Sequence, residues 1–136
     1  MKKLKRILLL LCISCTLFAC SSSNKDEEYR STIVGCWRQP GELESFTYYV
    51  VFNEDSTYYS YTISDVGFKT LTQSSSGKYE INNGKIKCIP DNGTISEVKI
   101  EEMTNENFIL QEGNNRATVS RISQEEMNQI LSETYH

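Results

Sequence analysis

The chain has 136 residues, of which 38% are apolar and 24% are charged, with 18 acidic side chains against 14 basic ones. This length is too short for two ordinary domains, and the composition is too mixed for a chain that is disordered throughout. We therefore expect one small domain. The excess of acidic side chains argues against nucleic acid as a partner.

The first 19 residues have the pattern of a secretory signal peptide. Four basic residues precede an apolar run from Ile7 to Phe18, which at about 12 residues is shorter than the roughly 20 that a helix needs to cross a membrane. We therefore expect residues 1–19 to be removed. Without their four basic residues, ten basic side chains face 18 acidic ones, and the net charge falls to near −8.

The end of this segment, Leu17-Phe18-Ala19-Cys20, resembles a bacterial lipobox, in which the cysteine is acylated and becomes the mature N-terminus. The resemblance implies that fatty acids such as palmitate on Cys20 hold the protein at the membrane. The alternative is an ordinary signal peptide whose last cysteine lies there by chance.

Residues 20–31 are polar and acidic, which predicts a flexible tether behind the lipidated cysteine. The run Lys25-Asp26-Glu27-Glu28 also resembles an export signal that sends some Gram-negative lipoproteins to the outer face of the outer membrane. The alternative is a solvated spacer. We expect a lipid anchor in the outer membrane, on its surface-exposed or its periplasmic face.

Residues 32–122 predict an antiparallel sheet, because apolar and polar residues alternate with a period of two. The clearest signal is the Asn83-Gly84 step, whose residues tolerate the positive φ of a tight hairpin. The expected strands are a first one that ends at Pro40-Gly41, followed by 45–52, 57–63, 68–72, 78–81, 85–88, 95–101, 107–111 and 116–121, with Ser74-Ser75-Ser76 as a polar loop.

Two cysteines remain in the folded part, Cys36 and Cys88, and an oxidising compartment invites a disulfide between them. Strand parity argues against this bond. If Trp37 faces inward, Cys36 faces outward, whereas Cys88 shares the inner face with Ile86.

The C-terminal segment has helical spacing instead. Ser123 and Glu126 form a capping box, and apolar residues follow on one helical face, so we expect a helix within residues 123–134 that packs on the outside of the sheet. The fold class is therefore all-β, an eight- or nine-stranded antiparallel up-and-down barrel with one C-terminal α-helix, because closure hides the sheet edges.

Gly35-Cys36-Trp37 has the Gly-x-Trp form of lipocalins, and the segments 52–57 and 77–81 are similar to those of small lipocalin-like domains in bacterial lipoproteins. The resemblance covers roughly residues 31–122. It implies that Gly35, Trp37 and Arg121 close one end of the barrel, with the Arg121 guanidinium lying across the indole. Such a contact contributes about 0.5 to 2 kcal/mol.

Enzymatic chemistry finds little support in the sequence. The sole histidine, His136, is the final residue, and the chain has no glycine-rich phosphate loop, Cys/His cluster or nucleophile elbow. We expect a non-enzymatic protein with no metal and no cofactor.

Four tyrosines, Tyr48, Tyr59, Tyr61 and Tyr79, are the candidate ligand-binding residues, with Tyr59 and Tyr61 expected on the inner face beside Ile63. The alternative is that tyrosine simply suits a strand with one wet face. Two functions follow. One is binding of a small hydrophobic molecule or a glycan at the open barrel end. The other is a structural or protein-interaction lipoprotein with a filled barrel and an envelope protein as partner, which the short turns and large inward side chains favour.

Overall fold

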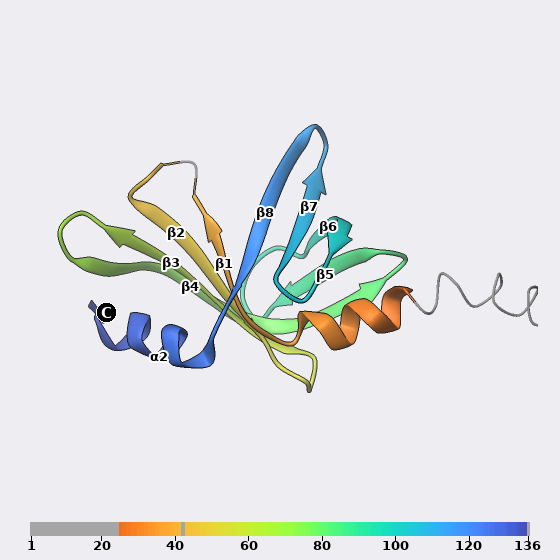
Figure 1. Cartoon of the computed structure of the whole chain (residues 1–136), viewed down its shortest axis with the longest axis horizontal. Helices are drawn as coiled ribbons and strands as arrows, with labels where there is room; N and C mark the ends of the chain where they lie inside the picture. Colours follow the sequence, from red (N-terminus) through yellow and green to blue (C-terminus); the bar gives the residue numbers. More distant parts are fainter. Residues whose placement is uncertain (1–24, 42, 136) are drawn as a thin grey trace, which may run out of the picture.

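The computed structural model describes residues 25–41 and 43–135, so the predicted signal peptide and Cys20 lie outside the described residues. Eight antiparallel strands close into a barrel, because β3 pairs with β4 and β1 pairs with β8 (Figure 1). The predicted all-β up-and-down barrel is confirmed. The strands are β1 (Gly35–Pro40), β2 (Phe46–Phe52), β3 (Thr57–Asp65), β4 (Lys69–Asn82), β5 (Lys85–Pro90), β6 (Ser96–Met103), β7 (Asn107–Glu112) and β8 (Asn115–Ile122).

β4 is longer than predicted. Ser74-Ser75-Ser76 is not a loop but the middle of a 14-residue strand, in which Ser74 lies opposite Tyr61 and Ser76 opposite Tyr59. Backbone pairing needs no apolar side chain on both partners, and the β3 tyrosines supply the strand preference. The ninth strand is instead the two-residue β9 (Thr134–Tyr135), which runs parallel to the start of β4.

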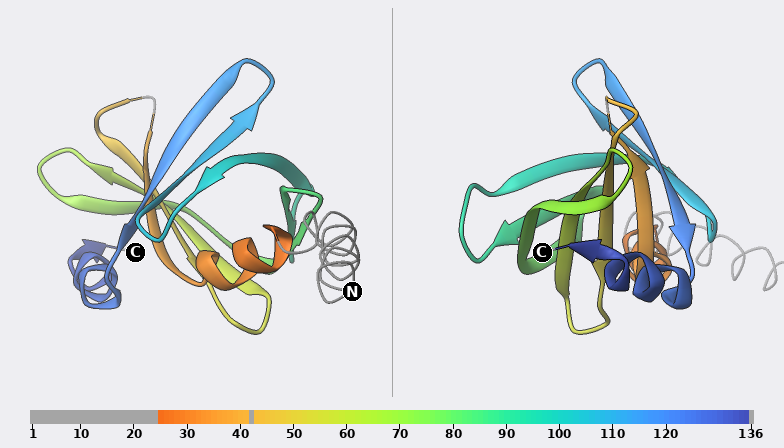
Figure 2. Two further views of the ribbon diagram at one scale, coloured as in Figure 1. Left: turned by 45° about the vertical axis from the view of Figure 1, so that its right-hand side comes forward. Right: turned by 90° about the vertical axis from the view of Figure 1, so that its left-hand side faces the viewer.

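The barrel is continuous at only one end, which we call the closed end. β1 and β8 pair over three residues, Cys36 to Arg38 with Ser120 to Ile122, and β5 pairs only with the last part of β4, from Gly77 onward. Beyond these two seams, β1, β2, β3 and the first half of β4 diverge from β5 to β8 as two lobes (Figures 1 and 2). The space between the lobes is the open end.

Trp37 forms the centre of the closed end, where its side chain is fully buried. Its ring meets the Phe108 ring edge-on with 4.6 Å between centroids, and the Cζ atom of Arg121 lies 4.2 Å from the Trp37 ring centroid. Trp37 and Arg121 are cross-strand partners on β1 and β8. The predicted stacking of Arg121 on Trp37 is therefore confirmed.

Gly35 provides the space that Arg121 needs. The Arg121 guanidinium donates to the carbonyl oxygen of Val34 at 2.9 Å and to that of Thr32, so it lies directly against the chain at Gly35. A Cβ atom on Gly35 would come within 2.4 Å of Nη1 of Arg121, and φ of Gly35 is 132°. The backbone angle favours glycine at this position, and any added Cβ would also displace the Arg121 guanidinium.

A helix over residues 25–33 packs against the closed end (orange in Figure 1). The Asp26 carboxylate accepts hydrogen bonds from the backbone N–H groups of Asn83 at 2.8 Å and Gly84 at 2.9 Å, and Arg30 donates to the Ile81 carbonyl at 2.6 Å. These contacts correct the predicted tether over residues 20–31, because residues 25–31 are helical. The β4–β5 turn leaves N–H groups without strand partners, and a buried carboxylate satisfies them.

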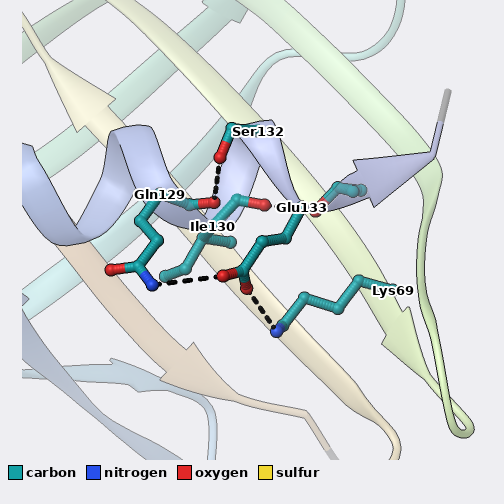
Figure 3. Close-up of polar contacts among 6 residues, drawn as sticks. Lys69, Gln129, Ile130, Ser132 and Glu133 are labelled. Atoms are coloured by element: carbon teal, nitrogen blue, oxygen red, sulfur yellow. Dashed lines mark hydrogen bonds and ion pairs between the residues drawn. The ribbon is translucent and has the colours of Figure 1, made fainter.

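The C-terminal helix α2 (Gln124–Ser132) starts where the capping box predicts, since the Ser123 hydroxyl accepts from the Glu126 N–H at 3.0 Å. Glu133 then fixes the other end through an ion pair of 3.0 Å with Lys69 of β4 (Figure 3). The helix covers part of the outer face of the barrel, as expected. The apolar cluster beneath it consists of Cys36, Tyr49, Ile63, Ile122 and Met127.

We expect Gly35→Ala to lower the free energy of unfolding by about 1 to 3 kcal/mol, because it adds backbone strain and displaces Arg121 from Trp37. Chemical denaturation measures this loss. Gly93→Ala is the matched control, since φ of Gly93 is 127°, close to that of Gly35, while the added Cβ meets only Cγ of Pro90, at an ordinary contact distance of 3.6 Å. Equal losses in the two variants would contradict the role of Gly35 as space for Arg121.

Candidate functional site

The inner side chains become smaller from the closed end to the open end of the barrel. Along β3 the inner residues change from Tyr58 to Ser60 and Thr62, and along β6 they change from Ile100 to Val98. Large aromatic rings therefore fill the closed half, whereas the smaller residues leave space between the lobes.

This space is a cavity of about 190 Å³. On one wall, large side chains of β2 lie beside small hydroxyl residues of β3, because Val50 pairs with Ser60 and Tyr48 pairs with Thr62. The lining consists of Phe52, Ile86, Phe108 and Val119 toward the closed end, and of Gln39, Tyr48, Tyr49, Val50, Ser60, Tyr61, Thr62, Cys88, Ser96, Val98 and Leu110 above them. None of these lining residues is charged.

A wider hollow of about 620 Å³ adjoins the cavity and shares Gln39, Val98 and Leu110 with it. It lies between the end of β1 and the start of β8, where the two strands no longer pair. Arg116 and Glu112 are the charged residues that line this wider hollow. Part of a ligand held in the cavity can therefore extend toward solvent here.

The prediction that Tyr59, Tyr61 and Ile63 face inward is wrong. The inner residue is Tyr58, which belongs to the core around Trp37, while Ile63 and Tyr61 pack in the outer cluster under α2. Tyr59 is 49% exposed on the outer face.

The turn before β3 explains this reversal. Asn53 and Thr57 are joined by a backbone hydrogen bond of 2.9 Å, so the turn between them has three residues, and Ser56 adopts a left-handed φ of 67°. A type I turn followed by one left-handed residue makes a loop with one residue more than a two-residue hairpin turn. The pairing of β3 with β2 is therefore offset by one residue from the pairing that the predicted strand bounds imply. This shift by one position places every β3 side chain on the opposite face from the one predicted.

The four candidate tyrosines are thus separated in space. Tyr48, which is 42% exposed, lines the cavity, and Tyr61 borders it. Tyr79 is buried in the closed half, where its hydroxyl donates to the Asn53 carbonyl at 2.8 Å and its ring meets Phe52 edge-on. Burial raises the pKa of Tyr79. Tyr59 lies on the outer face, away from the cavity.

The two described cysteines lie on opposite faces, as strand parity predicts, and both thiols are free. Cys36 lies under α2 and donates to Oε1 of Gln124 at 3.4 Å. Cys88 lines the cavity, where burial raises the pKa of its thiol to about 11.

Sequence reasoning missed Ser60, Thr62 and Ser96 as cavity residues. The signal for the first two was their alternation with Tyr58, which becomes visible only once the length of the preceding turn is known. Within residues 25–41 and 43–135, no group of three His, Cys, Asp or Glu side chains is placed to hold a metal ion. No helix in the same ranges is long and apolar enough to span a membrane.

Comparison with known proteins gives a family match and a set of similar structures. A sequence model of the lipocalin-like domain matches residues 20–110. No curated protein sequence matches the chain.

Three similar solved structures come from Bacteroides species, and at their identities they support the fold alone. An NMR structure of a protein from Bacteroides thetaiotaomicron VPI-5482 has a TM-score of 0.53 and 18% identity, over 69% of this chain and 92% of that one. A crystal structure of a protein from Bacteroides eggerthii DSM 20697 has a TM-score of 0.51 and 15% identity, over 66% and 99%. A lipocalin-like protein from Bacteroides uniformis ATCC 8492 has a TM-score of 0.51 and 11% identity, over 67% and 99%.

The half-buried thiol of Cys88 should react slowly. Its pKa of about 11, against 9.0 for an ordinary thiol, reduces the thiolate fraction at pH 8 about 100-fold. Since a thiolate of higher pKa is the better nucleophile, site-resolved alkylation by iodoacetamide should slow by about 10-fold or more. The rate should rise until the pH passes about 11. Because the raised pKa favours the folded protein only while the thiol is protonated, this stabilisation is complete below 9.0 and is lost as pH rises through about 11. Ordinary reactivity at pH 8 would contradict the raised pKa of Cys88.

Proposed function

The chain belongs to the lipocalin-like domain family, and we propose that it is a lipid-anchored, non-enzymatic protein of the cell envelope that binds a small, uncharged, mostly apolar molecule at its open end. One observation carries the choice of ligand. The cavity between the lobes is lined by apolar and hydroxyl side chains, with no charged residue among them.

The lining favours neutral ligands on energetic grounds. An ionised group that enters such a cavity loses its hydration and finds no opposite charge, which costs several kcal/mol. A neutral molecule with an occasional hydroxyl or carbonyl group instead meets Ser60, Thr62 and Ser96 as hydrogen-bond partners while its apolar part contacts Val98 and Leu110. Because about 190 Å³ is less than the roughly 300 Å³ of a typical site, the cavity suits a small ligand or one end of a longer one.

The environment of Cys88 supports a role in binding rather than catalysis. Cys88 is the strongest potential nucleophile of the cavity lining, but a thiol with a pKa of about 11 stays protonated at neutral pH. No charged group of the lining is available to activate it.

An anchor at Cys20 has a consequence for orientation. The docked helix is described from residue 25, and its Asp26 holds the β4–β5 turn at the closed end. Five residue steps from Cys20 to this helix can span at most about 18 Å. A lipid on Cys20 therefore keeps the closed end near the membrane and directs the open end away from it, on the surface-exposed or the periplasmic face of the outer membrane.

Exposed apolar side chains around the open end favour a second function, docking of an envelope protein. They come from the β1–β2 turn, the β3–β4 turn, the loop before β6 and the strand β9, and each is more than half exposed: Leu43 63%, Val66 65%, Phe68 58%, Ile95 53% and Tyr135 68%. Apolar side chains that gather on one end are typical of contact surfaces.

A titration with the neutral apolar dye N-phenyl-1-naphthylamine tests ligand binding. We expect a saturable rise in dye fluorescence, which 1-octanol should reverse at concentrations at least about 10-fold lower than octanoate, because the octanoate carboxylate has no partner in the cavity. Val98→Trp should weaken dye binding by at least about 10-fold by filling the cavity, while Tyr59→Ala on the outer face should not. No saturable response to the dye or to octanol would favour the protein-docking function instead.

The anchor is tested by Cys20→Ser expressed in a bacterium that processes lipoproteins. We expect the variant to move from the membrane fraction to the soluble fraction, since it removes the acylation site. Cys36→Ser is the control and should remain with the membranes. Unchanged membrane partition of Cys20→Ser would refute the lipid anchor without affecting the ligand site.

A further inference from the structure

A second hollow lies on the outer face of the barrel, and it differs in chemistry from the cavity. It is a groove of about 230 Å³ whose floor is the serine run of β4, Ser74 to Ser76. Tyr59 and Tyr61 of β3 form one side and Asp91 and Asn92, after β5, form the other. No aliphatic side chain belongs to this lining.

The strand register builds the groove. Tyr59 pairs with Ser76 and Tyr61 pairs with Ser74, so each ring stands beside a small side chain on the same face. Because β5 ends at Pro90, the chain that follows it is free to border β4 at Ser76. The groove forms because the small serine side chains lie between the large tyrosine rings on one side and the polar groups on the other.

Asp91 is held in place by two hydrogen bonds. Its backbone N–H donates to the Ser76 carbonyl at 2.8 Å, and the Ser76 hydroxyl donates to Oδ2 of Asp91 at 3.0 Å. A carboxylate fixed in this way needs little reorganisation to accept further hydrogen bonds. Tyr61 is fixed as well, since it packs against the cluster under α2, whereas Tyr59 is 49% exposed beside it.

We propose that this groove is a binding site for a neutral saccharide, with Tyr59 and Asp91 as its main contacts. A sugar ring presents an apolar C–H face, which packs on an aromatic ring, and a rim of hydroxyls, which bond to carboxylate, amide and hydroxyl groups. The groove contains aromatic, carboxylate, amide and hydroxyl groups together. Asp91 is its one charged residue, so anionic sugars are disfavoured.

The test uses NMR titration of the full chain with four probes: the methyl glycosides of glucose, galactose and N-acetylglucosamine, and glucuronate as the charged counterpart of glucose. At least one neutral glycoside should cause saturable shifts that map to residues 59–61, 74–76 and 91–92. Glucuronate should bind at least about 10-fold more weakly than the best neutral glycoside, because it meets Asp91.

Variants separate stacking from charge recognition. Tyr59→Ala should weaken binding at least about 10-fold, whereas Tyr59→Phe should retain it, because the ring and not the hydroxyl makes the contact. Asp91→Asn should reduce the preference against glucuronate, a result that loss of folding cannot imitate. Tyr48→Ala, in the cavity, should leave saccharide binding unchanged. The proposal is overturned by the absence of saturable shifts with all three neutral glycosides, by shifts that map to the cavity, or by unchanged affinity in Tyr59→Ala.

Discussion

The contact between Arg121 and Trp37 holds the barrel together at the point where it has least backbone support. β1 and β8 share only three paired positions, and this contact lies at the middle one. The same guanidinium reaches the carbonyl groups of Thr32 and Val34, so one side chain connects the last strand, the first strand and the end of the N-terminal helix. Gly35 makes that approach sterically possible.

The interior of the barrel changes from filled at the closed end to hollow at the open end. Rings packed around Trp37 fill the lower barrel, the decreasing size of inner residues opens a cavity above them, and the absence of charge in its lining selects the ligands that we propose. The outer face has the opposite character near Asp91, where aromatic and polar groups meet without aliphatic side chains. The two hollows thus differ in chemistry because they lie on opposite faces of the same strands.

The parts of the fold that depend on side-chain pattern were predictable from the sequence, and the parts that depend on backbone geometry were not. Alternation found the strands, the family resemblance placed Arg121 on Trp37, and spacing found the Ser123 cap of α2. The left-handed conformation of Ser56, which decides the faces of β3, has no clear sequence signal because glycine is absent there. The helical segment from residue 25 depends on contacts of Asp26 with a turn 57 residues later, which no local pattern reveals.

The two lobes are also unevenly joined by backbone hydrogen bonds. Ladders of hydrogen bonds join the lobes near Trp37 and at the last part of β4, whereas β1 past Arg38 is not laddered to β8. Spreading the upper lobes therefore bends strands without breaking a ladder between β1 and β8. The base is therefore constrained by paired strands on every side, whereas the width of the gap between the lobes is not fixed by backbone pairing of β1 with β8.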